Sequence, residues 1–148
     1  MKKVAWVSGS SRLIHQYADG LTEQRQEEYA YRYLHTANEA ADLLLVETYD
    51  HIVMEMYLAR GSDGKHPSLD KISSSEPIDM GIGLVCLLRT EESANRETPI
   101  VAITLLSQGG EQYREIAKQL QADKRTHVHS LSDNHFFETV TFLEQRIR

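Results

Sequence analysis

The sequence predicts an α/β protein built around a doubly wound, five-stranded parallel sheet. Five short apolar segments alternate with five segments of helical periodicity, and this alternation is typical of parallel strands joined by right-handed crossovers. Three of the apolar segments are apolar almost throughout, which is typical of strands that helices cover on both faces. The 148 residues, 41% of them hydrophobic, predict one domain with a substantial core.

The five expected strands differ in how polar and apolar residues alternate. The second places Tyr29, Tyr31 and Tyr33 on one side of the chain, which is typical of a half-exposed edge strand. The fourth, PIVAITL, shows no such alternation and predicts a buried strand. We expect the strands at residues 4–8, 29–35, 51–57, 99–105 and 126–131.

Apolar residues at spacings of three and four predict five helices. Thr36 and Asn38 are candidate caps of the second helix, and Asp133 of the fifth, because short polar side chains accept hydrogen bonds from first-turn N–H groups. Gly81 and Gly83 lower the helix propensity of the third. We expect the helices at residues 11–28, 39–48, 78–89, 109–121 and 133–148.

The segment 59–77 is polar and rich in Ser, Gly, Asp and Lys, which predicts a long loop after the third strand. Loops of this length are usually either functional or flexible. We expect a mobile connection, or else a lid or partner-docking element over the end of the third strand.

Composition excludes several classes of function. The formal net charge is −6 and basic residues form no cluster, which disfavours binding to nucleic acid. The single cysteine, Cys86, lies in the apolar run GIGLVCLL, which predicts a buried, inert thiol in a reducing compartment. No apolar run has the length of a signal peptide or a membrane span. We therefore expect a soluble, cytoplasmic protein.

Candidate functional residues follow the strands, because doubly wound sheets bind ligands at the carboxyl ends of their strands. Ser8 to Ser10 follow the first strand, Glu55 ends the third, Thr104 ends the fourth, and His127 and His129 lie in the fifth.

The order and spacing of these elements resemble the receiver domain of two-component response regulators over essentially the whole chain. The sequence IVMEMYLARGSDG is similar to the family's third strand and loop, and it places Glu55 at the phospho-accepting Asp and Asp63-Gly64 at a following Asp-Gly pair. PIVAIT resembles the fourth strand, which ends in Thr or Ser, here Thr104, and SDNHFFETVTFL resembles the start of the fifth helix. The resemblance implies the flavodoxin-like (βα)₅ fold with strand order 2-1-3-4-5.

The same resemblance implies that the chain departs from the family at most catalytic positions. Ser8 and Gly9 stand where the family has two Mg²⁺-binding acids, and His129, or else His127, stands where it has a lysine that pairs with the phosphoryl group. Mg²⁺ needs oxygen ligands that usually include carboxylates, and phosphoryl transfer depends on positioning and charge neutralisation. We predict a degenerate receiver that is not an enzyme and uses no cofactor. If any transfer survives, Glu55 is the acceptor, Thr104 an oxygen ligand and His129 the cationic partner.

The role of Glu55 has two interpretations at this stage. It can hold permanently the negative charge that the family acquires transiently, or it can be a strand-end acid paired with a base or with His129. Under the first interpretation the protein binds a protein partner, such as a histidine kinase or a downstream regulator, through the family's switch face. That face consists of the fourth helix, the fifth strand and the fifth helix, including residues 109–120 and 126–137. A homodimer is an alternative arrangement.

Other functions stay open from the sequence. The turn VSGSSR after the first strand is a natural anion cradle and resembles the phosphate-binding turn of NAD(P)H-dependent FMN reductases. In that alternative Ser8, Gly9, Ser10, Ser11 and Arg12 surround the FMN phosphate; a plain turn with a helix cap by Ser10 or Ser11 is the simpler interpretation. A third alternative is a scaffold subunit of a larger assembly.

Histidine spacing does not predict a metal site. His127 and His129 lie two residues apart and point to one face of a strand, and His135 follows after the strand. This spacing is not diagnostic of a zinc site, so we predict no bound metal.

Overall fold

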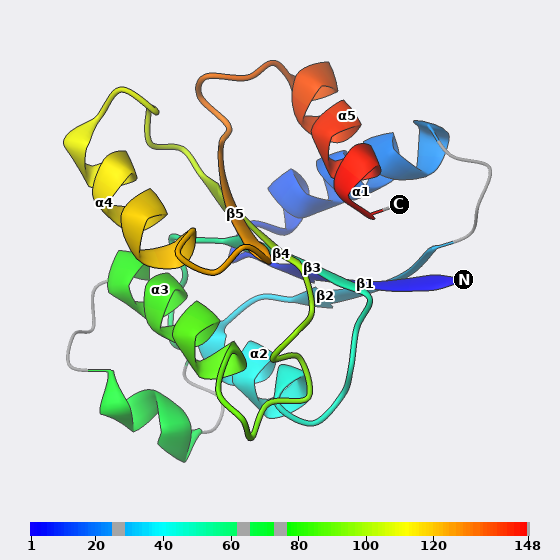
Figure 1. Cartoon of the computed structure of the whole chain (residues 1–148). Coiled ribbons are helices and arrows are strands. Elements are labelled where there is room, and N and C mark those ends of the chain that lie inside the picture. Colours follow the sequence, from blue (N-terminus) through cyan, green and yellow to red (C-terminus); the bar gives the residue numbers. More distant parts are fainter. Residues whose placement is uncertain (25–28, 62–65, 73–76, 148) are drawn as a thin grey trace.

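Five parallel strands form one sheet, and helices cover both of its faces (Figure 1). The computed structural model describes residues 1–24, 29–61, 66–72 and 77–147. The strands are β1 (Lys2–Val7), β2 (Tyr29–Leu34), β3 (His51–Glu55), β4 (Ile100–Thr104) and β5 (Thr126–Ser130). The helices are α1 (Ser11–Gln24), α2 (Ala37–Leu44), the 3₁₀ helix η1 (Pro67–Lys71), α3 (Pro77–Leu88), α4 (Glu111–Leu120) and α5 (Phe136–Ile147). The strand order is β2-β1-β3-β4-β5, which confirms the predicted doubly wound, flavodoxin-like fold.

The register of the sheet brings the ends of four strands together. Val7 of β1 lies opposite Met54 of β3, and Thr104 of β4 lies opposite Ser130 of β5. Because all pairs are parallel, these carboxyl ends meet at one side of the sheet, on the left in Figure 1. We call this side, which includes Glu55 at the end of β3, the carboxyl edge.

The sheet separates two apolar cores, because successive side chains of a strand point to opposite faces. Helices α1 and α5 cover the face on which Trp6, Val53 and Ile103 are buried. Helices α2, α3 and α4 cover the other face, with Met54 and Ala102. All five side chains are at most 1% exposed, and burial of each large apolar side chain contributes about 1.5–3 kcal/mol. This burial on both faces explains why β1, β3 and β4 are apolar almost throughout.

Strand β2 is an edge strand, as the alternation of its tyrosines predicted. The rings of Tyr29 and Tyr31 stack at 5.6 Å, and Tyr31 packs edge-on against Trp6 at 5.8 Å. The Tyr31 hydroxyl lies 2.9 Å from Oγ1 of Thr22 on α1, and burial raises the pKa of Tyr31 to about 12. The tyrosine row thus joins β2 to α1.

Two of the predicted helix caps are wrong. Thr36 is the N-cap of α2, and its Oγ1 accepts a hydrogen bond from the Glu39 amide at 3.2 Å, as expected. Asn38 instead lies inside the first turn, buried, and its amide donates to the Gly61 carbonyl at 3.0 Å. Asp133 lies before α5 and accepts hydrogen bonds from outside that helix, as described below.

The glycines of α3 have a packing role that offsets their low helix propensity. A Cβ atom on Gly81 would lie 2.1 Å from the Met56 carbonyl oxygen, and one on Gly83 would lie 2.5 Å from Cδ1 of Ile72. At position 81 the obstacle is backbone, so only glycine lets α3 approach the chain after β3 this closely, whereas at position 83 it is the end of the Ile72 side chain.

Cys86 is exposed on the outer side of α3, so the prediction of a buried thiol is wrong. Helix α3 is apolar on nearly all sides, and apolar sequence neighbours therefore did not reveal which face is covered. Partial burial still raises the pKa of the thiol.

The segment 59–77 is packed against the protein where the structure describes it, and it contains the helix η1, which the sequence did not predict. The carbonyls of Ala59 and Arg60 each accept a hydrogen bond at 2.9 Å from amides of the first turn of α2. Leu69 of η1 is completely buried in the core on the α2 and α3 side. The predicted Asp63-Gly64 pair lies outside the described residues.

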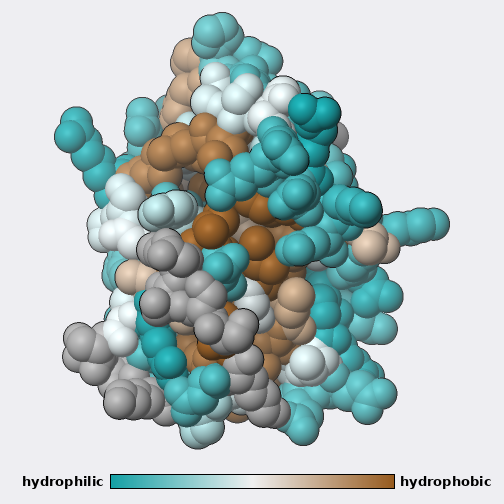
Figure 2. Space-filling view, turned by 90° about the vertical axis from the view of Figure 1, so that its left-hand side faces the viewer, coloured by the Kyte–Doolittle hydropathy of each residue, from teal (hydrophilic) through white to brown (hydrophobic). Residues whose placement is uncertain are grey.

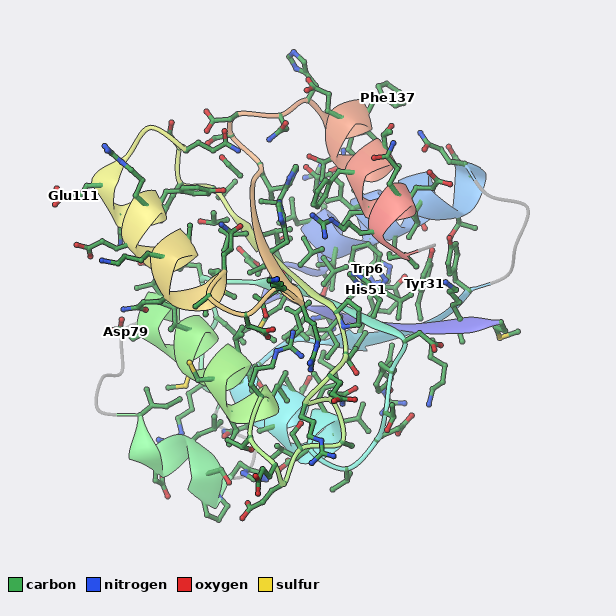
Figure 3. The ribbon with its side chains drawn as sticks, viewed as in Figure 1. Trp6, Tyr31, His51, Asp79, Glu111 and Phe137 are labelled. Carbon is green, nitrogen blue, oxygen red and sulfur yellow. The ribbon has the colours of Figure 1, made fainter. Side chains whose placement is uncertain are left out.

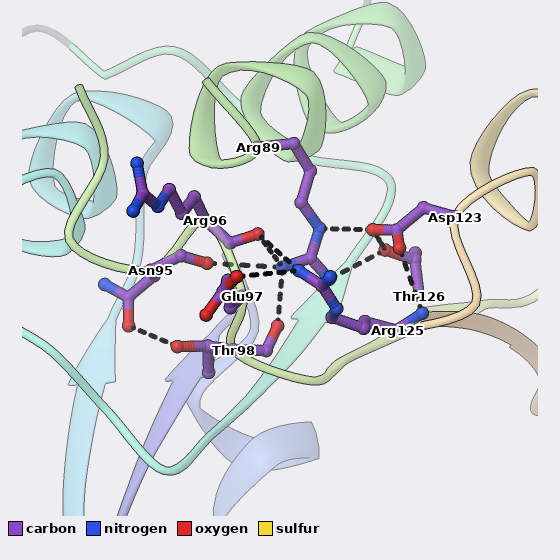
Figure 4. Close-up of polar contacts among 8 residues, drawn as sticks. All are labelled: Arg89, Asn95, Arg96, Glu97, Thr98, Asp123, Arg125 and Thr126. Carbon is purple, nitrogen blue, oxygen red and sulfur yellow. Dashed lines mark hydrogen bonds and ion pairs between the residues drawn. The ribbon is translucent and has the colours of Figure 1, made fainter. Parts of the chain in front are cut away.

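The guanidinium of Arg89, just after α3, joins several segments at the opposite edge of the sheet (Figure 4). Its Nε atom lies 2.6 Å from Oδ2 of Asp123, which follows α4. Its Nη2 atom donates to Oγ1 of Thr126 at 2.9 Å. Its Nη1 atom donates to the carbonyls of Thr98 (2.6 Å), Arg96 (3.2 Å) and Asn95 (3.2 Å). This network holds the end of α3 against the amino ends of β4 and β5.

His51 is a buried titratable side chain at the start of β3 (Figure 3). The residue is 2% exposed, and neither ring nitrogen has a hydrogen-bond partner among the described residues. Burial, and secondly the positive charges of Arg146 and Lys2, lower the pKa of His51 to about 4. The ring is therefore neutral in the folded protein at neutral pH.

We expect His51 to make the protein less stable in mild acid. The unfolded chain binds a proton at this ring near pH 6.5, whereas the folded protein binds it near pH 4, so stability falls as the pH drops through this window. The whole effect is about 3 kcal/mol. Urea unfolding at pH 7.5 and pH 4.5 measures it, and His51→Leu should lose most of the difference. His135→Gln, at an exposed histidine, is the control; equal pH dependence in His51→Leu and the parent would contradict the assignment.

Candidate functional site at the carboxyl edge

Ser8 and Glu55 lie side by side at the carboxyl edge. Val7 pairs with Met54, so the next residues along each strand are level with one another. Ser8 is completely buried, and its hydroxyl donates a hydrogen bond to Oε2 of Glu55. The same hydroxyl oxygen accepts a hydrogen bond from the Ser10 amide at 3.0 Å. The sheet therefore attaches the Glu55 carboxylate to the turn after β1.

Glu55 has no positively charged partner within the described residues. The one hydrogen bond of its carboxylate there is the bond from Ser8, and no Lys, Arg or His whose side chain the structure describes forms an ion pair with it. The structure thus gives no support, over these residues, to the interpretation of Glu55 as an acid paired with a base or with His129.

A hollow of about 300 Å³ opens beside this carboxylate. Glu55 and Thr104, which end β3 and β4, line it together with Tyr57, Leu105 and Leu106 from the connections that follow. Tyr57 and Leu105 are 63% and 67% exposed, large values for apolar or aromatic side chains. Figure 2 shows the molecule from the side of the carboxyl edge, with apolar surface gathered in its middle and polar residues around it.

Thr104 shapes the chain where β4 ends. It is 5% exposed, its Oγ1 accepts a hydrogen bond from the Leu106 amide at 3.1 Å, and its carbonyl accepts one from the Leu131 amide at 2.7 Å. The structure therefore brings Thr104 and Glu55 to the same hollow, two of the three residues expected from the receiver resemblance.

The third expected residue, His129, makes its contacts with α5. Its ring stacks on Phe142 at 4.5 Å, and its Nε2 atom lies 2.9 Å from Oγ1 of Thr139. Burial, and secondly His127, lower the pKa of His129. The alternative residue, His127, also contacts Phe142 and lies 3.1 Å from Nη2 of Arg146. These contacts do not support the role of a cation at Glu55 for either histidine.

Ser130 is a residue of this edge that the sequence alone did not single out. It lies opposite Thr104, and its hydroxyl donates to the Leu106 carbonyl at 2.7 Å. Close by, the Asp133 carboxylate accepts hydrogen bonds from the Gln108 amide and from the Ser107 hydroxyl. The connection between β4 and α4 is thus tied to the connection between β5 and α5. Only the strand register, which pairs Ser130 with Thr104, could have indicated this.

The groups of the SGSSR turn are already engaged within the protein. The Ser10 amide donates to Ser8, and Oγ of Ser10 accepts a hydrogen bond from the Leu13 amide at 3.3 Å, as a helix cap does. The Arg12 side chain is exposed. The Glu55 carboxylate beside the turn would repel a phosphate, so this geometry favours the turn-and-cap interpretation over an FMN site.

No group of three or more His, Cys, Asp or Glu side chains among the described residues is arranged to hold a metal ion. Likewise, no helix within the described ranges is long and apolar enough to cross a membrane.

No protein-family model and no curated protein matches the chain. Solved structures do match it. CheY4, a chemotaxis response regulator of Vibrio cholerae, is 18% identical with a TM-score of 0.67, over 100% of this chain and 99% of that chain. A signal receiver domain of a two-component histidine kinase from Clostridium thermocellum is 11% identical with a TM-score of 0.69, over 99% and 98%. This chain has the receiver fold. The non-phosphorylated HemR receiver domain of Leptospira biflexa is a further example, at 20% identity and a TM-score of 0.63, over 99% and 94%.

Within the receiver fold, the network around Ser130 should keep the connection after β4 ordered. We expect Ser130→Ala to lower the free energy of unfolding by about 1–2 kcal/mol, because the Leu106 carbonyl loses its partner. Amides of residues 106–110 should exchange hydrogen faster, as measured by mass spectrometry. Ser132→Ala is the control, because it removes a hydroxyl that lies 3.1 Å from Oγ of Ser130 and leaves the bond from Ser130 to Leu106 in place. Unchanged exchange in Ser130→Ala would show that this bond does not order the connection.

Proposed function

We propose that this receiver-fold protein is a signalling module that binds a protein partner and does not depend on phosphorylation. One observation carries the proposal: the Glu55 carboxylate accepts a hydrogen bond from the neutral hydroxyl of Ser8, at the place where the receiver resemblance implies acids that hold Mg²⁺. The neutral Ser8 hydroxyl does not compensate the negative charge of the Glu55 carboxylate, so this site carries a negative charge without phosphorylation.

The same geometry disfavours phosphoryl transfer. Ser8 and Gly9 contribute no carboxylate, so the ends of β1 and β3 offer Glu55 alone to a cation that prefers several oxygen ligands. The pKa values of His127 and His129 are lowered, first by burial, which favours neutral rings. Without a metal ion or a fixed cation, the charge that develops on a transferred phosphoryl group has no stabilising partner. We therefore propose that the protein is not an enzyme.

A chain of contacts joins the Glu55 hollow to the proposed partner face. Leu105 and Leu106 line the hollow, Leu106 is bonded to Ser130, and Asp133 is bonded to the chain just before α4. A charge at Glu55 can therefore favour one arrangement of the starts of α4 and α5 over another. This supports a role for the carboxylate in setting the shape of that face.

The proposed partner face comprises α4, β5 and α5. On α4, a shallow hollow of about 340 Å³ is lined by Glu111, Arg114, Glu115 and Lys118. On α5, the side chain of Phe137 is 72% exposed (Figure 3). The charged side chains of α4 and the exposed aromatic ring of α5 lie on separate parts of this face, and both kinds of residue are typical of protein-binding surfaces. A histidine kinase or a downstream regulator is the proposed partner class, and a second copy of the chain is the alternative.

We expect no phosphorylation from a small-molecule donor. The protein is incubated with acetyl phosphate and Mg²⁺, and its intact mass is compared with that of Glu55→Gln treated in the same way. Neither should gain a phosphoryl group. A gain in the parent that is absent from Glu55→Gln would make Glu55 a working acceptor and would overturn the proposal.

Phe137 should be important for binding the partner. We expect Phe137→Ser to weaken partner binding at least about tenfold, since exposed aromatic anchors contribute about 2 kcal/mol or more at an interface. Quantitative mass spectrometry of captured proteins, with sedimentation to detect dimers, measures the effect. Val46→Ser, at a residue that is 77% exposed after α2, is the matched control. Loss of the same partner in Val46→Ser but not in Phe137→Ser would place the interface elsewhere.

A further inference from the structure

The hollow beside Glu55 is lined by large side chains that are exposed and therefore add little to the core of the fold. Tyr57 and Leu105 are 63% and 67% exposed, although their chain neighbours Met56 and Thr104 are only 0% and 5% exposed. Leu106 adds apolar surface, and the three side chains border one opening. Exposed apolar patches on proteins of this size often mark binding sites. Figure 2 shows apolar surface in the middle of this side of the molecule.

The floor of the hollow carries a negative charge with no counter-ion among the described residues. Oε2 of Glu55 accepts the Ser8 hydrogen bond, which leaves Oε1 without a hydrogen-bond donor over the described chain. Asp79 and Glu111, in the first turns of α3 and α4, lie at the same end of the molecule (Figure 3). Two arginines near this edge have partners of their own: Arg60 forms an ion pair with Asp70, and Arg114 donates a hydrogen bond to the Gly109 carbonyl. The exposed side chain of Arg12, in the first turn of α1, also lies at this edge, so the negative charge relevant to the hollow is that of Glu55 itself, which accepts its hydrogen bond from a neutral hydroxyl.

The chemistry of the hollow selects one kind of occupant. An anion would meet the charge of Glu55, and a purely apolar group would bury that carboxylate without a partner, which is unfavourable. An arginine side chain satisfies both requirements. Its methylene groups can pack on Leu105 and Leu106, its guanidinium can stack on the Tyr57 ring, and its N–H groups can donate to the free oxygen of Glu55.

The size of the hollow points to a side chain presented by another protein. A volume of about 300 Å³ is at the lower end for small-molecule sites, and the opening is bordered by exposed apolar residues that would contact the residues flanking the arginine. We infer that this hollow binds an arginine side chain from an apolar segment of a partner protein. The inference rests on the hollow and its charge, and it does not depend on the partner face of α4, β5 and α5.

A titration with a short peptide tests the inference. The probe is acetyl-Leu-Arg-Leu-amide, followed in amide NMR spectra of the labelled protein, and the matched probe has citrulline, a neutral analogue, in place of arginine. We expect shift changes confined to residues 55–58 and 104–107, with the citrulline peptide about tenfold weaker because it lacks the charge. The arginine affinity should also fall with rising salt concentration.

Three variants separate the contribution of the Glu55 charge to peptide binding from that of the apolar side chains that line the hollow. Glu55→Gln should weaken the arginine peptide about tenfold and remove its advantage over the citrulline peptide. Leu105→Ser changes an exposed wall residue, should leave the fold intact, and should weaken both peptides. Glu92→Gln, an exposed residue in the connection between α3 and β4, is the control and should bind as the parent does.

The outcomes distinguish this inference from the proposed function. Equal binding of the two peptides, unchanged affinity in Glu55→Gln, or no shift changes at millimolar peptide would overturn the inference. Shift changes on α4 and α5 in place of the hollow would also overturn it, while they would agree with the proposed partner face. Phosphorylation of Glu55 by acetyl phosphate would overturn the proposed function and leave the arginine site standing.

Discussion

The parallel pairing of β3 with β1 and β4 is the constraint on which the rest of this structure depends. Both neighbours and both helical layers cover β3, so a polar side chain is tolerated mainly at its ends. Glu55 stands at one end, attached to Ser8 across the pair with β1. His51 stands at the other, neutral and buried. The same pairing sets Thr104 beside Glu55 and thereby forms the hollow.

The two edges of the sheet are held in different ways. At the amino edge, Arg89 is bonded to carbonyls, a hydroxyl and Asp123, which fixes α3 against β4 and β5. At the carboxyl edge, the Ser130 hydroxyl and the Asp133 carboxylate form hydrogen bonds to the connection after β4. Charge is compensated at the first edge, whereas at the second Glu55 has no ion pair among the described residues. An interaction that supplies a positive charge is therefore more favourable at the carboxyl edge.

The proposed partner face and the proposed arginine site share the connection between β4 and α4. Leu105 and Leu106 line the hollow, and the same connection leads directly into α4. A side chain bound in the hollow would contact residues whose backbone is bonded to Ser130 of β5 and to Leu131 just after it. Binding at one surface could thus change the affinity of the other, and such coupling acts equally in both directions. In this arrangement an uncompensated carboxylate would respond to a binding partner, where the receiver family responds to phosphorylation.

The sequence by itself determined the number, order and type of the five strands and the five α-helices, but not the 3₁₀ helix η1. Strands covered on both faces need near-continuous apolar runs, and a helix cap such as Thr36 depends on residues three positions away, so both are visible locally. Glu55 and Thr104 were identifiable because strand ends are where polar residues follow apolar runs. The tertiary structure alone decided which way side chains face. His129 contacts Phe142, Asp133 accepts hydrogen bonds from the chain before α4, Cys86 is exposed, and Ser130 lies opposite Thr104. Each of these depends on register and packing between segments far apart in the chain, which no local pattern of residues encodes.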